Sequence, residues 1–201
     1  MAAVQTFRKW ASRGASALLV AAVILSESYW TLRHPVTGGV FFALGVSLAA
    51  VAVLGRVWCA IYIEGYKTKS IINMGPYSLC RNPLYFFSLT GAAGIGLTTE
   101  TLTIPILICI GFIFYYLPVI KNEESHLEKL HPADFKIYKQ TTPAYWPRFS
   151  HLREPDMYTV NPKKIRKELL SGIWFFLAIA IIHVIKTLHA FGAFPVMFKL
   201  Y

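Results

Sequence analysis

Apolar and polar stretches alternate along the chain in a way that is typical of a membrane protein. Five apolar stretches are predicted as helices, at residues 15–30, 40–63, 84–97, 102–120 and 171–189. An apolar helix of about 20 residues crosses the hydrocarbon core of a bilayer. The pattern therefore predicts an all-α integral membrane protein with five transmembrane helices. The first stretch is short, so it is expected to lie tilted or to begin before Gly14.

The third and fourth stretches are separated by a short turn, Thr98–Thr101, and are predicted to form a helical hairpin. The third stretch is rich in glycine, alanine and serine, and such small side chains let helices approach closely in lipid. The two ends of the hairpin away from the turn, near Asn82 and Glu123, are then expected to lie on the same side of the membrane.

Proline and glycine predict two interruptions in the helical pattern. Pro35 with Gly38 and Gly39 predicts a helix break between the first two apolar stretches. Pro132 predicts a break within an amphipathic helix over residues 124–138, which follows the fourth stretch.

The basic residues lie between the apolar stretches and predict the orientation of the chain. The net charge is +10, and 16 of the 20 lysines and arginines fall in segments on the same side as the amino terminus. Cytoplasmic segments carry such an excess. We therefore predict a cytoplasmic amino terminus, in a plasma, inner or endoplasmic reticulum membrane, and no nucleic-acid partner. Arg56, near the cytoplasmic end of the second stretch, is expected to extend toward the head groups.

The composition indicates a single membrane domain over residues 1–201. Its apolar fraction is 55% and its mean hydropathy is +0.48, on the membrane side of soluble proteins. Residues 150–170 are predicted as a basic cytoplasmic linker and 171–201 as the last span and tail. The three cysteines have no paired spacing and the histidines are scattered, so we predict neither a disulfide framework nor a metal site.

Two polar segments interrupt the apolar pattern and carry the candidate chemistry. The first polar segment is Gly75–Tyr85, which contains two prolines, and the second polar segment is Lys121–Glu124. Pro83 suits the first turn of a helix, which makes Asn82 the expected N-cap. Considered separately, the first is typical of an interfacial anchor and the second of the start of a solvated helix.

The two polar segments lie at the two ends of one predicted hairpin, so they are predicted to meet around a single volume. A carboxylate, a helix N-terminus and aromatic rings in that volume would suit a cationic ligand, held by charge attraction and cation–π contact. A sulfonium methyl donor is one ligand of this kind.

Five motifs follow one another in an order found in a known group of membrane enzymes. They are Gly75-Pro-Tyr77, Arg81-Asn-Pro-Leu-Tyr85, Glu123-Glu124, Phe135-x-x-Tyr138 and Pro147-Arg-Phe149. The chain resembles the integral-membrane methyltransferases of the isoprenylcysteine carboxyl methyltransferase and phospholipid methyltransferase families, over a methyltransferase-like core at residues 62–149. The resemblance implies S-adenosylmethionine as the cofactor, a cytoplasmic-facing cofactor site, and a membrane lipid or lipidated small molecule as the methyl acceptor.

The resemblance also implies which side chains bind the cofactor. The side of the site that binds the adenosyl group is implied to consist of Lys69, Ser70, Ile71 and Ile72. The residues implied to pack around the rest of the cofactor are Tyr77, Asn82, Pro83, Leu84 and Tyr85, and Tyr62 is implied to lie at the edge of the site. Glu123 is implied to hold the cationic methionine portion, with Arg81 and Glu124 as structural support. No catalytic residue is assigned.

The chain departs from the family pattern at two positions. Asn82 stands where the family has a histidine, and an asparagine can form hydrogen bonds but cannot act as a general base. Val119 stands where the family has a substrate-binding arginine. A carboxylate acceptor needs no base because it is ionised at neutral pH, whereas an amine needs its proton removed by another group.

The predicted reaction is direct transfer of a methyl group to a lipid-borne carboxylate, amine or hydroxyl, with the acceptor entering from the membrane. Two alternatives stay open at this point. One is a sterol-reductase-like enzyme that binds NADPH, and the other is a non-catalytic transporter or assembly subunit. The sequence determines neither the acceptor nor the oligomeric state.

Overall fold

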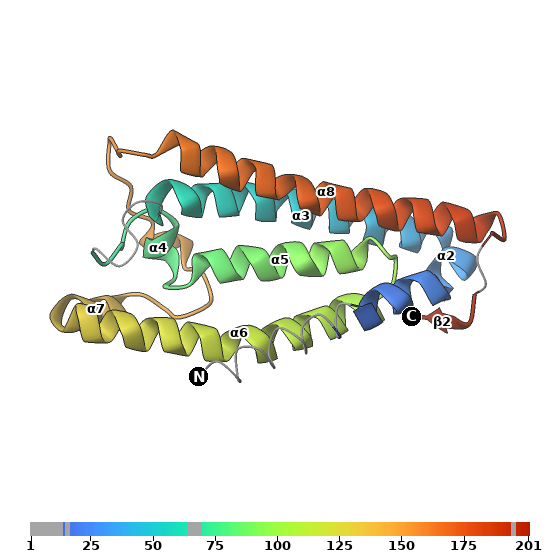
Figure 1. Cartoon of the computed structure of the whole chain (residues 1–201), viewed down its shortest axis with the longest axis horizontal. Helices are drawn as coiled ribbons and strands as arrows, with labels where there is room; N and C mark the ends of the chain where they lie inside the picture. Colours follow the sequence, from blue (N-terminus) through green and yellow to red (C-terminus); the bar gives the residue numbers. More distant parts are fainter. Residues whose placement is uncertain (1–13, 15–16, 64–69, 194–195) are drawn as a thin grey trace.

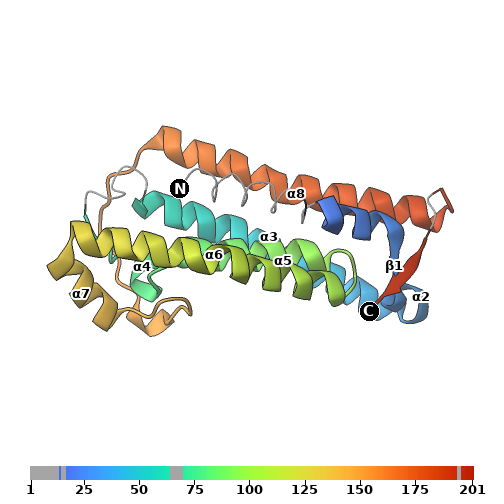
Figure 2. The same cartoon turned by 60° about the horizontal axis from the view of Figure 1, so that its bottom comes forward.

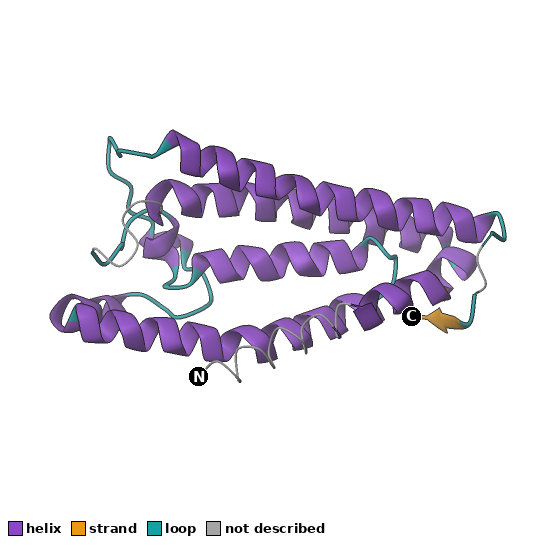
Figure 3. Cartoon of the chain, viewed as in Figure 1, coloured by secondary structure: helices purple, strands orange, loops and turns teal. Residues whose placement is uncertain are grey.

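The computed structural model describes residues 14, 17–63, 70–193 and 196–201. These residues are mostly helical and form an elongated bundle (Figure 1, Figure 3). Three of the described helices are long and apolar enough to cross a membrane, namely α3 (Pro35–Ile63), α6 (Thr103–Leu130) and α8 (Pro162–Ala190). They correspond to the second, fourth and fifth predicted stretches.

The first and third predicted stretches form shorter helices. Helix α5 (Pro83–Leu97) is apolar but has only 15 residues. Residues 17–25 are helical, and the chain then forms strand β1 (Ser26–Ser28) and helix α2 (Tyr29–Arg33). A helix of 15 residues is about 22 Å long, which is less than the ~30 Å of a bilayer core. The number of five spans therefore stays a prediction.

Helix α5 packs against α3, α6 and α8, and α3 also packs against α8 (Figure 1, Figure 2). The crossing of α3 and α5 depends on two glycines. A Cβ atom on Gly45 would lie 2.6 Å from the carbonyl oxygen of Gly94, and one on Gly94 would lie 2.7 Å from that of Gly45. The backbones touch at this point, as the small residues of the third stretch predict.

The predicted break near Pro35 occurs at His34, between α2 and α3, and the glycine pair after it lies inside α3. Pro35 is the first residue of α3, where its missing N–H removes no helical hydrogen bond. A Cβ on Gly38 would come within 2.8 Å of Glu100 Oε2. Glycine at this position therefore makes room for a neighbouring side chain and does not end the helix.

Two short strands depart from the predicted all-α fold. Strand β1 pairs in parallel with β2 (Phe198–Leu200) at the end of the bundle that also carries α2 (Figure 2). At the same end, Lys186 of α8 forms an ion pair with Glu100, and Thr31 of α2 donates a hydrogen bond to the same carboxylate. These contacts join α8, α2 and the turn between α5 and α6.

Arg56 does not extend toward the head groups as the sequence predicts. Its guanidinium donates to Ser88 Oγ on α5 and to Glu168 Oε1 on α8, each at 2.5 Å. Helix α8 begins at Pro162, well before the predicted start at Ser171, and this extension brings Glu168 opposite Arg56. A charge inside a bundle needs a partner of opposite charge, and the interhelical pair supplies it.

Helix α6 continues past Ile120, the predicted end of the fourth stretch, and contains the second polar segment. Helix α7 (Pro132–Thr141) follows after the break that Pro132 predicts. Helices α4 (Pro76–Leu79) and α7 lie at one end of the bundle, opposite the strands (Figure 1). The 3-10 helix η1 (Phe149–His151) packs against α4. We call this end the site end, because both polar segments lie there.

Candidate functional site

The first polar segment turns sharply at Gly75. Its φ is 55°, a left-handed backbone conformation that favours glycine, and a Cβ there would lie 2.3 Å from the ring of Tyr62. Pro76 then begins α4, and Ser78 Oγ donates to the Gly75 carbonyl at 2.6 Å. The turn brings Tyr77 into the same buried core cluster as Tyr62.

The connection between α7 and α8 runs along the first polar segment and binds its backbone. The N–H of Gly75 donates to the carbonyl of Arg153 at 2.7 Å. The N–H of Arg81 donates to the carbonyl of Pro143 at 2.8 Å. The backbone of the first polar segment is therefore held from outside by residues far along the chain.

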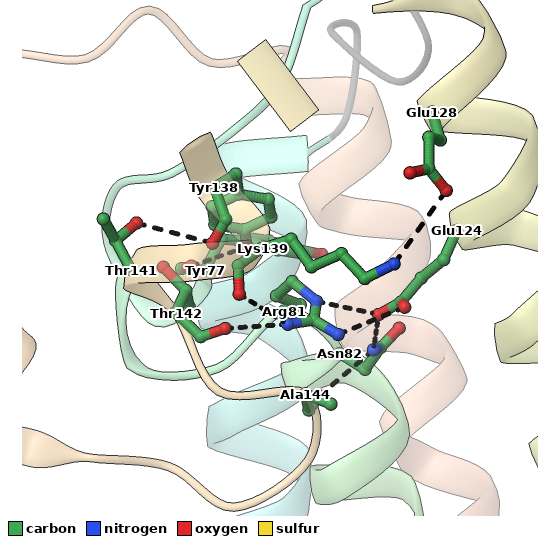
Figure 4. Close-up of polar contacts among 10 residues, drawn as sticks. All are labelled: Tyr77, Arg81, Asn82, Glu124, Glu128, Tyr138, Lys139, Thr141, Thr142 and Ala144. Atoms are coloured by element: carbon green, nitrogen blue, oxygen red, sulfur yellow. Dashed lines mark hydrogen bonds and ion pairs between the residues drawn. The ribbon is translucent and has the colours of Figure 1, made fainter. Parts of the chain in front are cut away.

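Arg81 joins the two polar segments. Its Nε donates to Glu124 Oε1 at 3.0 Å and its Nη2 donates to Glu124 Oε2 at 3.2 Å (Figure 4). Its Nη1 donates to the carbonyl of Thr142 at 2.9 Å. A two-pronged arginine–carboxylate pair constrains both distance and orientation. The structure thus brings the two polar segments and the connection after α7 together at one place.

Asn82 is the residue before α5, but its side chain does not cap that helix, contrary to the prediction. Its Nδ2 donates to Glu124 Oε1 at 2.9 Å and to the carbonyl of Ala144 at 3.1 Å. A capping bond would use the amide oxygen of Asn82, and the two bonds donated by Nδ2 fix the orientation of the whole amide instead. Asn82 therefore extends the network of Arg81 and Glu124 (Figure 4).

Glu123 has a different partner from its neighbour Glu124. Tyr85 Oη, on α5, donates to Glu123 Oε2 at 3.0 Å. Consecutive residues of a helix point about 100° apart, so the two glutamates of α6 reach different parts of the site.

Helix α7 packs Tyr138 against the first polar segment. Tyr138 Oη donates to the carbonyl of Tyr77 at 2.7 Å. Burial raises the pKa of Tyr138 well above its usual value, and burial also raises the pKa of Cys80 to about 11. Both groups are therefore protonated at neutral pH, and the Cys80 thiol is a poor nucleophile.

These contacts surround a cavity of about 290 Å³, which we call the first cavity. Pockets for small molecules measure roughly 300–1,000 Å³. The predicted cofactor-binding residues in its walls are Ser70, Ile71, Ile72, Tyr77, Asn82, Leu84, Tyr85 and Glu123. The two predicted supporting residues, Arg81 and Glu124, line it as well.

Two predicted cofactor-binding residues within the described part of the chain do not line this cavity, and the placement of a third is not tested. Tyr62 lies in the core against Gly75, and its hydroxyl donates to Glu154 Oε1 at 3.3 Å. Pro83 is fully buried at the start of α5. Lys69 lies outside the described residues.

Several wall residues of the first cavity were missed by the sequence analysis. They are Ile63, Asn122, His126, Leu127, Phe135 and Tyr138. A signal for part of this set exists in α6, because Asn122 and His126, like Glu123 and Leu127, are spaced i, i+4 and share a helix face. Extending the fourth helix through the second polar segment would have found them.

The hydroxyl of Tyr77 is buried in the wall of the first cavity and has no hydrogen-bond partner among the described residues. A buried hydroxyl without a partner costs free energy. This atom therefore suits a polar group of a bound ligand. The cavity also contains the carboxylate of Glu123 and the ring of Tyr85. Together these groups suit a cationic ligand with polar substituents.

A second cavity, of about 220 Å³, is formed by α5, α6 and residues 145–146. Its walls consist of Asn82, Tyr85, Phe86, Leu89, Phe112, Ile113, Tyr116, Leu117, Ile120, Tyr145 and Trp146, none of which is charged. The ring of Tyr116 lies 5.2 Å from that of Tyr85 and 4.2 Å from that of Phe112, measured between centroids. Asn82 and Tyr85 belong to the walls of both cavities.

Residues 36–134 match the family model described as phospholipid methyltransferase. The match covers α3, α5 and α6 and includes both polar segments. The resemblance that the motifs indicate is confirmed over these residues. The three long apolar helices also indicate a membrane protein.

Two curated relatives are similar to this chain. The cobalt-zinc-cadmium resistance protein CzcN of Cupriavidus metallidurans is 40% identical over 132 residues, which cover 66% of this chain and 59% of the relative. The nickel-cobalt-cadmium resistance protein NccN of Alcaligenes xylosoxydans xylosoxydans is 38% identical over 132 residues, which cover 66% of this chain and 60% of the relative. The chain thus spans about three fifths of the length of these relatives. No solved structure matches the chain.

Proposed function

We propose that the protein is a membrane methyltransferase that uses S-adenosylmethionine and acts on a lipid-borne acceptor. The observation that carries this proposal is the pair of cavities that share Asn82 and Tyr85 in their walls. One cavity has carboxylates and an unpartnered hydroxyl, and the other is apolar and aromatic. The match of residues 36–134 to the phospholipid methyltransferase family model supports the same reaction class.

The first cavity would hold the cofactor. S-adenosylmethionine carries a methyl group on a positively charged sulfonium, and this makes the methyl carbon electrophilic. Glu123 would attract the cationic portion and the ring of Tyr85 would contact it through its π face. Tyr77 Oη would bind one of the polar groups of the cofactor, because it has no partner among the described residues.

The second cavity would hold the reacting end of the acceptor. Leu89, Ile113 and Leu117 form an apolar part of its wall that suits hydrocarbon. An anionic carboxylate would be buried there without a basic side chain in the wall, which is unfavourable by several kcal/mol. Val119 also stands where related enzymes have a substrate-binding arginine. Among the three predicted acceptor classes, we therefore favour an amine or a hydroxyl.

The names of both curated relatives refer to resistance against cobalt, cadmium and further metals. We propose that this chain, if it shares such a role, contributes to it by modifying a lipid of the membrane. The cytoplasmic position of the cofactor cavity, where the cofactor is made, is part of the same proposal and follows from the distribution of basic residues.

Binding of radiolabelled S-adenosylmethionine to the purified full chain in detergent tests this function. We expect Glu123→Ala and Tyr85→Ala each to weaken binding about tenfold or more, which corresponds to ~1.4 kcal/mol. Glu128→Ala is the matched control, since Glu128 lies on the same helix, is half exposed and contacts Lys139 only at 4.0 Å. It should bind as the wild type does.

Two results would contradict the proposal. If the wild-type protein does not bind S-adenosylmethionine, the methyltransferase function is wrong. Binding of NADPH in its place would favour the reductase alternative. If both site variants bind as tightly as Glu128→Ala, the cofactor lies elsewhere.

A further inference from the structure

Tyr85 occupies a position between the two cavities. Its side chain lines both of them, and its hydroxyl donates to Glu123 Oε2, in the wall of the first cavity, at 3.0 Å. On the side of the second cavity its ring packs against Tyr116. One phenol thus links an apolar cavity to a carboxylate that does not itself line that cavity.

An amine or hydroxyl acceptor must lose a proton, and Asn82 cannot take it. The amide nitrogen of Asn82 is already donating to Glu124 and Ala144, and an amide has no titratable group at neutral pH. Among the described wall residues of the second cavity, the titratable side chains are the phenols of Tyr85, Tyr116 and Tyr145. Of these, Tyr85 donates a hydrogen bond to a carboxylate, that of Glu123.

Other ionisable groups surround the pair and contribute to its electrostatics. On the first polar segment these groups are Tyr77 and Arg81, and on α6 they are Tyr116, Glu124 and His126. The other elements contribute one group each, namely Tyr138 on α7, Arg56 on α3 near Tyr116, and Tyr145 on the connection after α7. Glu124 is neutralised by Arg81 in a direct ion pair. Glu124 also reaches the second cavity through Asn82, but an amide does not relay a proton at neutral pH. Glu123 reaches that cavity through the hydroxyl of Tyr85.

We propose that Tyr85 and Glu123 form the proton-accepting pair for the methyl acceptor, an inference that rests on the proposed function. The proton leaving the acceptor nitrogen or oxygen passes to Tyr85 Oη, and the proton already on Tyr85 Oη passes to Glu123 Oε2. Tyr85 ends as a neutral phenol and Glu123 as a carboxylic acid, so one proton has moved from acceptor to carboxylate. Glu123 later returns this proton to solvent through the first cavity.

In this arrangement the chain replaces the missing histidine by two residues on different helices. Tyr85 is the catalytic residue, because it reaches the acceptor cavity, and Glu123 acts through it. The opposing explanation is purely structural, namely that the hydrogen bond only ties α5 to α6. The two explanations differ in whether turnover and cofactor binding change together.

The test compares Tyr85→Phe with Tyr115→Phe in the full chain. Tyr115 lies on α6 beside Tyr116 and is not among the described wall residues of either cavity, and each substitution removes only a hydroxyl. The acceptor probe is vesicles of phosphatidylethanolamine and phosphatidylglycerol, which present an amine and hydroxyls. Methyl transfer is measured at saturating S-adenosylmethionine, and the Kd for S-adenosylmethionine is measured separately without vesicles.

We expect Tyr85→Phe to lower kcat by about 100-fold or more, the usual range for loss of an acid–base group, with the Kd within about twofold. Tyr115→Phe should retain kcat within about threefold. Glu123→Gln should lower kcat by a similar factor to Tyr85→Phe at saturating S-adenosylmethionine, because an amide cannot accept the proton from Tyr85.

Three results would overturn the inference. The first is a kcat for Tyr85→Phe equal to that of Tyr115→Phe, and the second is a parallel loss of kcat and cofactor affinity in Tyr85→Phe. The third is a kcat for Glu123→Gln that equals the wild-type value at saturating S-adenosylmethionine. A wild-type protein that transfers no methyl group to these vesicles would instead overturn the proposed function, and the pair with it.

Discussion

Gly75, in the first polar segment, needs to be glycine for two reasons, its backbone conformation and the lack of space for a side chain. Its backbone is left-handed, and the ring of Tyr62 occupies the space where a side chain would lie. Arg81 shows the same dependence on particular partners, because its guanidinium donates to both Glu124 and the carbonyl of Thr142. At the scale of single residues, the first cavity is therefore built by groups that have few acceptable substitutes.

Gly75→Ala is expected to destabilise the protein strongly. A left-handed backbone costs an alanine about 1–2 kcal/mol, and the new methyl group also overlaps the ring of Tyr62, adding about 1–3 kcal/mol. Gly192→Ala is the matched control, because Gly192 has a φ of 69° but open space around it. Thermal unfolding in detergent should show a clearly larger loss for Gly75→Ala. Equal losses would mean that backbone strain alone matters at Gly75.

At the scale of elements, the length of α6 decides what the site contains. The helix carries apolar residues through most of its length and then, without interruption, the second polar segment. Its i, i+4 spacing places Asn122 and His126 in the first cavity, while Phe112 and Tyr116 line the second. One continuous helix thus supplies walls to both cavities.

The contact between α3 and α5 gives an element-scale prediction. Gly45→Ala should destabilise the bundle by about 1–3 kcal/mol, because the added methyl would lie 2.6 Å from the carbonyl of Gly94 on the other helix. Gly39→Ala, in the same helix but with open space around it, should stabilise by up to about 1 kcal/mol through helix propensity. Unfolding of both variants under the same detergent conditions measures the difference. A stabilising Gly45→Ala would contradict the close crossing.

The whole molecule has two chemically different ends. The site end carries the cavities, α4 and α7, and the opposite end carries the two strands and the ion pair of Lys186 with Glu100 (Figure 1, Figure 2). The basic residues of the sequence predict that the site end faces the cytoplasm. A cofactor made in the cytoplasm could then reach the first cavity directly.

Labelling of introduced cysteines tests this orientation. Met157→Cys lies at the site end and Phe191→Cys lies just after α8 at the other end, and both native side chains are highly exposed, at 90% and 82%. In sealed right-side-out vesicles, a membrane-impermeant maleimide should label Phe191→Cys and should label Met157→Cys only after permeabilisation. The wild type controls for Cys59, Cys80 and Cys109. The reverse pattern would invert the predicted topology.

The two polar segments could be recognised from sequence because their chemistry is local. A proline after Asn82, an arginine before it and two consecutive glutamates on the next helix are visible without coordinates. Side-chain partners were less predictable. Asn82 was expected to cap α5 and Arg56 to extend toward the head groups, yet both bind glutamates from other helices. Such partners depend on which helix faces lie together, and local pattern does not specify that.

The sequence by itself determined the apolar helices, the hairpin that brings the two polar segments to one end, and the resemblance to a family. These follow from hydrophobic period and motif order, which are properties of neighbouring residues. Only the tertiary structure decided that Tyr85 stands between two cavities and that Glu123 and Glu124 take different partners. The reason is that a cavity and a hydrogen bond between helices depend on the angle and depth at which helices pack, and those are set by the whole bundle.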